Sequence, residues 1–120
     1  MRSATELGLH FSNHSDYMVT PLDPLFTVWT AVNRLSRTGR VIGPDERISP
    51  RQALKAITLD AAWQYGEENS KGSISPGKLA DLVILDGNPL TIDPVAIKNI
   101  QIMATYKKGK LVYSAPTAAP

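Results

Sequence analysis

The two histidines of the chain, His10 and His14, lie close together near its N-terminus, and Asp16 follows after one further residue. Side chains alternate between the faces of an extended strand, so residues 10, 14 and 16 would share one face. An imidazole and a carboxylate on one face could chelate a metal ion, or the carboxylate could orient the imidazole. The alternative is a hydrogen-bonded histidine and an aspartate that caps a turn. On spacing alone, a two-residue motif favours this alternative.

Two further segments have the composition of functional motifs but are better explained by structure. Gly72 to Lys78 has the glycine spacing of a phosphate-binding loop, yet Leu79 stands where that motif requires Ser or Thr. The segment also does not link a hydrophobic strand to a helix, so we reject a phosphate site. Ser49 precedes Gln52 in a capping-box pattern, which predicts a helix start rather than a nucleophile.

The remaining charged and aromatic residues predict structural roles. Asp81 lies at the start of an apolar run, where its carboxylate is expected to accept local backbone hydrogen bonds. A cluster of lysines marks a predicted hairpin tip, and a solvated turn is favoured there over a phosphate contact. These lysines are Lys107, Lys108 and Lys110. The two tryptophans and four tyrosines fall mainly on apolar stripes, so we expect them in the core.

Composition narrows the class of protein. The 120 residues are 42% hydrophobic and 20% charged, which is typical of one globular unit or a piece of one. A net charge of +2 is too small to indicate a nucleic-acid or polybasic membrane partner. The absence of cysteine excludes thiolate zinc sites and thiol nucleophiles. Without a signal peptide or an apolar run of about 20 residues, we expect a soluble, cytoplasmic protein.

Periodicity indicates that helices precede strands. Residues 9–14 have the length of one strand. A helix is predicted at about 24–36, with Asp23 as its N-cap, and a second at about 50–65, with Ser49 as its N-cap. A lone strand ahead of two helices has no obvious pairing partner, so its neighbours are expected outside this chain.

From Gly72 onward the pattern favours a sheet. Residues 80–85 form a β-rich apolar run, and residues 100–106 and 110–113 form a predicted hairpin. The residues 114–120 are rich in Pro and Ala and are predicted to be a disordered tail. Together these elements predict an α+β arrangement of strand, helix, helix and short antiparallel strands.

These motifs resemble the metal-dependent amidohydrolase superfamily, and the branch called amidohydrolase family 3 in particular. Residues 72–86 fit nearly all of its C-terminal signature, G-S-I-x-x-G-K-x-A-D-L-V-V-L-D. Residues 49–62 resemble the helix before that signature, and residues 102–113 resemble the closing hairpin. Residues 14–25 are similar to the end of the eighth barrel strand and its loop. The resemblance is collinear over about 5–113.

This resemblance implies a fold. Members of the superfamily have a (β/α)8 barrel and a smaller composite β-sandwich. Residues 1–71 would be the C-terminal end of the barrel, with strand 8 at about 9–14. Residues 72–113 would be part of the sandwich, so the chain would be an α+β fragment of the whole fold.

The resemblance also implies a site. Asp16 would be the aspartate that ends strand 8, binds a divalent metal (zinc is expected) and takes a proton from the attacking water. His14 would contact Asp16 rather than the metal. The other ligands of the family have no counterpart in this sequence. The site is therefore expected to be incomplete, with no metal bound and no catalysis by this chain alone.

Two functions from different classes follow. The first is the C-terminal part of a metal-dependent hydrolase of non-peptide carbon–nitrogen bonds, with a small amide-like substrate. The second is a stand-alone binding or oligomerisation module that self-associates through an exposed strand edge. A metal site made by His14 and Asp16 alone is a third, less favoured possibility.

Overall fold

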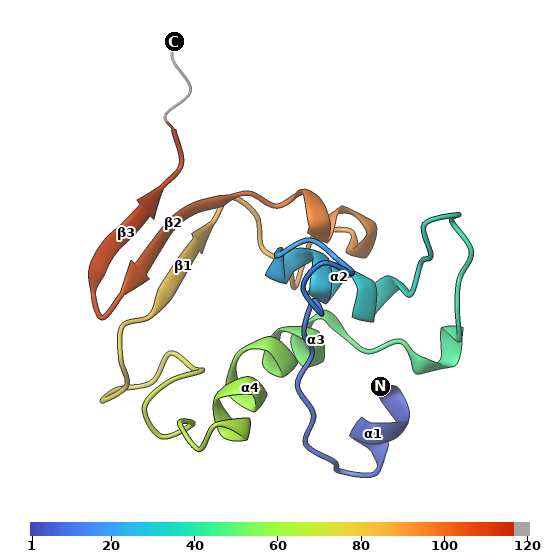
Figure 1. Ribbon diagram of the computed structural model, residues 1–120, viewed down its shortest axis with the longest axis horizontal. Helices are drawn as coiled ribbons and strands as arrows, with labels where there is room; N and C mark the ends of the chain where they lie inside the picture. The colour runs from blue at the N-terminus through green and yellow to red at the C-terminus, as the bar shows by residue number, and fades with distance from the viewer. Residues whose placement is uncertain (117–120) are drawn as a thin grey trace.

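The structure of the protein is a computed structural model that describes residues 1–116 (Figure 1). Helices form one part of the molecule, and a sheet projects from it. The elements, in chain order, are α1 (Arg2–Glu6), α2 (Pro24–Asn33), η1 (Pro44–Glu46), α3 (Pro50–Ile57), α4 (Leu59–Gln64), β1 (Leu82–Leu85), η2 (Pro94–Asn99), β2 (Ile102–Lys107) and β3 (Lys110–Ser114).

Helices α2 and α3 begin at the predicted caps. The Asp23 carboxylate accepts the backbone N–H groups of Leu25 and Phe26, at 2.9 and 3.1 Å. Ser49 and Gln52 form the capping box in both directions. Helix α2 ends at residue 33, earlier than expected, because Arg34 adopts a left-handed conformation with φ 52°. The predicted helix over 50–65 is two helices, since Thr58, at φ −124° and ψ −86°, separates α3 from α4.

The core lies between α2, α3 and η2. Val28 of α2 and Ile97 of η2 are fully buried at its centre. Two side chains of α2 also bond the backbone at η2: Trp29 Nε1 donates to the Val95 carbonyl at 2.9 Å, and the buried Asn33 amide donates to the Pro94 carbonyl at 2.9 Å. Because both of these donors have acceptors, the apolar contacts between α2 and η2 form without leaving either group unpaired.

The sheet is antiparallel, in the order β1-β2-β3. Val83 pairs with Thr105, which pairs in turn with Tyr113. Within residues 1–116, the buried core cluster contains no residue of the three strands. All five residues of β3 are exposed, and Val112 is 62% exposed. The chain is therefore a small α+β unit whose sheet lies outside its helical core.

Two predictions differ from the structure. Residues 9–15 form no strand, because a strand requires backbone bonds to a neighbour, and this segment contacts helices instead. The predicted tail begins too early, since Ser114 belongs to β3 and the Ala115 N–H donates to the Met103 carbonyl at 2.8 Å. The last four residues of that tail, 117–120, lie outside the described residues. Within residues 1–116, no helix has the length and apolarity to cross a bilayer.

Candidate functional site

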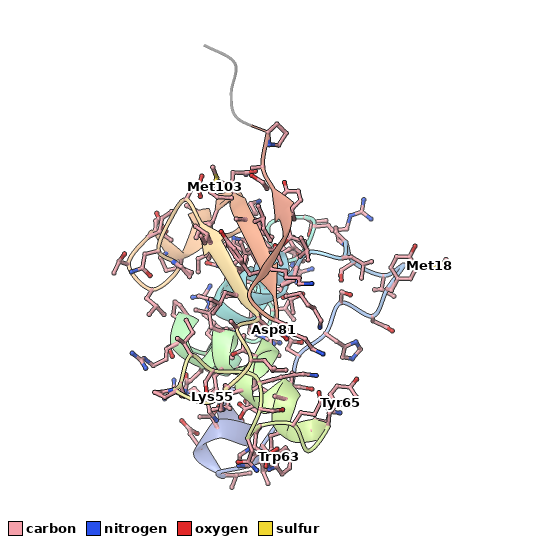
Figure 2. The ribbon with its side chains drawn as sticks, turned by 90° about the vertical axis from the view of Figure 1, so that its left-hand side faces the viewer. Met18, Lys55, Trp63, Tyr65, Asp81 and Met103 are labelled. Atoms are coloured by element: carbon pink, nitrogen blue, oxygen red, sulfur yellow. The ribbon has the colours of Figure 1, made fainter. Side chains whose placement is uncertain are left out.

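Asp16 begins a turn directly after the irregular segment of residues 9–15. Its φ is +48°, and its carbonyl accepts the Val19 N–H at 2.9 Å. Aspartate tolerates this left-handed region better than most residues. Met18, in the same turn, has φ 82° and is 87% exposed (Figure 2). Strained backbone of this kind is concentrated at functional sites, so the turn is a candidate for function.

The Asp16 carboxylate differs from four other aspartates of the chain, whose carboxylates bond backbone groups. Asp23, Asp81, Asp86 and Asp93 each accept a backbone N–H. Within the described part of the chain, no donor bonds the carboxylate of Asp16, which is exposed. Because capping does not occupy it, this carboxylate is available to bind a ligand or to accept a proton.

His14 contacts the backbone of Asp16 rather than its carboxylate. The Asp16 N–H donates to His14 Nδ1 at 3.0 Å, so the neutral ring carries its proton on Nε2. The exposed ring lies at the edge of an open hollow, and Asp16 is not among the residues that line it. The lining residues are Asn13, His14, Ser15, Leu22, Asp23, Pro24, Thr27 and Ile57.

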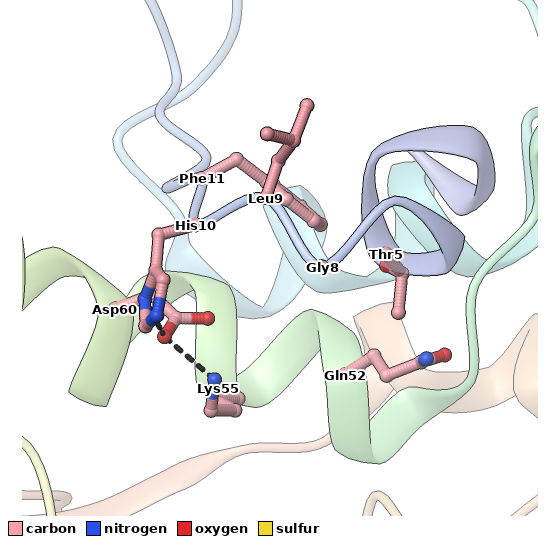
Figure 3. A pocket seen from close by; sticks show the side chains of 8 residues that line it. All are labelled: Thr5, Gly8, Leu9, His10, Phe11, Gln52, Lys55 and Asp60. Carbon is pink, nitrogen blue, oxygen red and sulfur yellow. Dashed lines mark hydrogen bonds and ion pairs between the residues drawn. The ribbon is translucent and has the colours of Figure 1, made fainter.

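The structure does not bring His10, His14 and Asp16 together. The shared face required an extended strand, and the left-handed turn at Asp16 ends that alternation. His10 lies instead against α4, where its ring stacks on Trp63 at 4.3 Å between centroids (Figure 3 shows His10 beside Asp60). Among residues 1–116, no three His, Cys, Asp or Glu side chains are grouped to hold a metal ion.

Asp60 is a site residue that the sequence did not indicate. Its side chain is 9% exposed, and Oδ1 accepts from Lys55 Nζ at 2.7 Å and lies 3.5 Å from His10 Nδ1. Trp63 was expected in the core but is 48% exposed, with His10 over its ring. Neither contact could be predicted, because some fifty residues separate these helix positions from His10.

The lysine of the signature stabilises a loop. Lys78 Nζ donates to the Ser73 hydroxyl at 2.7 Å and to the Lys71 carbonyl at 3.1 Å. Its ammonium is therefore engaged within the loop. Gly72, at φ +80°, lies so close to α4 that an added Cβ would be 2.8 Å from both Ala62 Cβ and Leu59 Cα.

The aspartate of the signature has a structural role as well. Asp81 Oδ1 accepts the Lys108 N–H at 2.8 Å, and Oδ2 lies 3.8 Å from Lys107 Nζ. The hydrogen-bond partner of Asp81 is a backbone group, as predicted. This group is distant in sequence, however, because Lys108 lies in the turn between β2 and β3. The signature thus connects the end of the helical body to the hairpin, and both its lysine and Asp81 are engaged in bonds that stabilise the fold.

Comparison with known proteins gives the family context. Residues 1–113 match the family model described as amidohydrolase family. Over 113 residues, the chain is 33% identical to the N-substituted formamide deformylase of Arthrobacter pascens, covering 94% of this chain and 21% of that protein. The chain therefore spans about a fifth of the length of this relative.

Solved structures also match most of this chain. The crystal structure of an amidohydrolase from Thermotoga maritima matches with a TM-score of 0.67 and 25% identity, covering 95% of this chain and 25% of that one. Guanine deaminase of E. coli matches with a TM-score of 0.70 at 23% identity, over 95% of this chain and 30% of that one. The second likeness is evidence of fold alone.

Proposed function

The chain belongs to the amidohydrolase family, and from this premise we propose that it is the C-terminal part of an enzyme that hydrolyses non-peptide carbon–nitrogen bonds. The name of a relative supports this class, since a deformylase of N-substituted formamides acts on a carbon–nitrogen bond. Residues 1–71 would complete the barrel, with 9–14 as its eighth strand, and residues 72–113 would belong to the β-sandwich.

We assign the chemistry of this chain to Asp16. The observation that carries the assignment is its exposed carboxylate, which has no hydrogen bond within residues 1–116, in a left-handed turn. The turn follows the segment that the sequence resemblance assigns to the eighth barrel strand. Active sites of such barrels lie at the C-terminal ends of strands. A carboxylate there can accept a proton from the attacking water and return it to the leaving amine. His14 would support the turn through its bond to the Asp16 N–H.

A divalent metal, with zinc as the expected ion, fits these residues only in part. Asp16 can supply one oxygen ligand, but a catalytic zinc requires about three protein ligands. The group of ligands required does not occur within the described chain. The remaining ligands would come from the rest of the enzyme, and we expect this chain alone to be inactive. When bound, the ion would lower the pKa of water.

The test replaces Asp16 by Asn in the whole enzyme that contains these residues. We expect kcat to fall by about two to four orders of magnitude, the usual contribution of a positioned proton acceptor. Asp45→Asn is the matched control, because it makes the same change at an exposed carboxylate of η1 that is not assigned to the site. Activity of the Asp16 variant near that of the unaltered enzyme would exclude the assigned role.

The second candidate is a stand-alone module that associates through its sheet. The observation that favours it is the exposure of apolar strand residues, with Val83 51%, Ile84 50% and Leu111 55% exposed. Light scattering after size-exclusion chromatography of the 120-residue chain separates the two candidates. A stable dimer or larger assembly would support the module, and a monomer would count against it.

A further inference from the structure

Two side chains of the irregular segment of residues 9–15 contact helix α4. The His10 ring stacks on Trp63 at an interplanar angle of 24°, and its Nδ1 lies 3.5 Å from Asp60 Oδ1 (Figure 3). Two residues further along, the Ser12 hydroxyl donates to the Gln64 side-chain oxygen. These contacts are made by side chains, unlike the backbone bonds that hold a strand in a sheet.

The spacing of these contacts has a geometric basis. His10 and Ser12 are two residues apart and would lie on one side of an extended backbone, about 7 Å apart. Asp60 and Gln64 are four residues apart and lie on one face of a helix, about 6 Å apart. Because the two repeats nearly match, two successive contacts form together, and a shift of the segment by one residue would break both.

The helix side of this contact is itself fixed. Asp60 is buried and bonded to Lys55 of α3, so the carboxylate beside His10 is held in place. The Asn13 backbone N–H then donates to the Ala56 carbonyl of α3 at 3.2 Å. The segment is thus held at positions 10, 12 and 13, just ahead of the turn at Asp16.

We propose that Asp60, Trp63 and Gln64 form a positioning surface that sets the register of residues 10–13 and so fixes Asp16 in its working position. This inference rests on the proposed function only for what Asp16 does. The contact itself is independent of that function. Trp63 is the main positioning residue, because its ring stacks on that of His10, and His10 is the residue through which it acts.

The first experiment tests the contact in the 120-residue chain. Amide hydrogen exchange of Asn13 is measured in Trp63→Ala, in Trp63→Phe and in the control Tyr65→Ala, which removes an 80% exposed aromatic just beyond the same helix (Figure 2). We expect exchange to accelerate at least about tenfold in Trp63→Ala and to stay near the original rate in the other two. If Asn13 exchanged at the same rate in the unaltered chain and in all three variants, the proposal would be overturned.

The second experiment measures the consequence in the whole enzyme. We expect Trp63→Ala to lower kcat by about 10- to 100-fold with little change in KM, because a displacement of about 1 Å in a reacting group has that cost. Trp63→Phe, which keeps a ring under His10, should recover most of the rate, and Tyr65→Ala should not alter it. A merely stabilising role would not give this division between kcat and KM.

Asp16→Asn in the same assay separates the two proposals. If Asp16→Asn abolishes activity and Trp63→Ala does not reduce kcat, the positioning proposal is wrong and the proposed function stands. If Asp16→Asn leaves the activity intact, the proposed function is wrong, and the exchange rate of Asn13 still decides whether α4 fixes the segment.

Discussion

The region of residues 72–114 and the segment of residues 9–23 differ in how their backbones are held. The first is bonded as a sheet, and its polar residues bond the backbone, as Asp81 does with Lys108. The second has no regular structure from residue 9 to residue 15 and then enters a left-handed turn whose carboxylate has no bond within the described residues. The first region uses polar groups to stabilise the fold, whereas the second leaves the Asp16 carboxylate without a hydrogen bond among the described residues.

The longest sequence motif and the proposed base therefore lie in different regions of the chain. The longest sequence motif of the chain lies in residues 72–86, and its Gly, Lys and Asp positions act in folding. The candidate base lies in the less regular segment, because a group that caps the backbone cannot also be free to react. Substitutions in the first region should therefore alter stability, and those in the second should alter activity.

The largest effect on stability is expected for Gly72→Ala. An added Cβ would be 2.8 Å from Leu59 Cα and 2.9 Å from the Thr58 carbonyl, at a φ of +80°. The combined overpacking and left-handed strain should lower the free energy of unfolding by about 2–5 kcal/mol. Denaturant unfolding measures the change. The control is Gly77→Ala, at φ +88° with no atom within 4 Å, which should lose only about 1 kcal/mol. Equal losses would contradict the packing argument.

Lys78→Met comes next. The substitution removes both bonds of the ammonium group to the loop and should lower the free energy of unfolding by about 1–3 kcal/mol. Lys110→Met, at an exposed strand position, should change it by less than about 0.5 kcal/mol. If Lys78→Met and Lys110→Met unfolded at the same temperature and the same denaturant concentration, the two bonds of Lys78 would not stabilise the protein. Lys78 would then have a role other than stabilisation.

Asp81→Ala should have a smaller, local effect of about 1 kcal/mol, because the Lys108 N–H loses its acceptor. Amide exchange at Lys108 should be faster in this variant. Asp81→Asn keeps an oxygen for that bond and should recover much of the protection. If the Asn variant exchanged as fast as the Ala variant, the charge of the carboxylate, rather than the bond, would be the stabilising feature.

The smallest effect on stability is expected for Asp16→Asn. Asparagine tolerates positive φ, and the carboxylate has no bond to lose within the described chain, so the free energy of unfolding should change by less than about 0.5 kcal/mol. The same substitution should lower kcat of the whole enzyme by about two to four orders of magnitude. A loss of more than about 1.5 kcal/mol on unfolding would show that Asp16 has a structural role, and the contrast between the two regions would fail.

Local chemistry was sufficient to predict several elements. Asp23 and Ser49 were predicted as caps because a short polar side chain before an apolar stripe bonds the next free N–H groups. The hairpin around Lys108 followed from a turn between apolar runs. The end of α2 and the break at Thr58 were not predicted, since both depend on backbone angles that the apolar spacing does not determine.

The sequence by itself determined the family, the caps and the residue types at the candidate site, because each depends on neighbouring residues or on a collinear motif. Only the tertiary structure decided that His10 contacts Asp60 and Trp63 instead of Asp16, and that residues 9–15 contact α4. Contacts between residues about fifty positions apart depend on how the helices pack, and no local pattern records that packing.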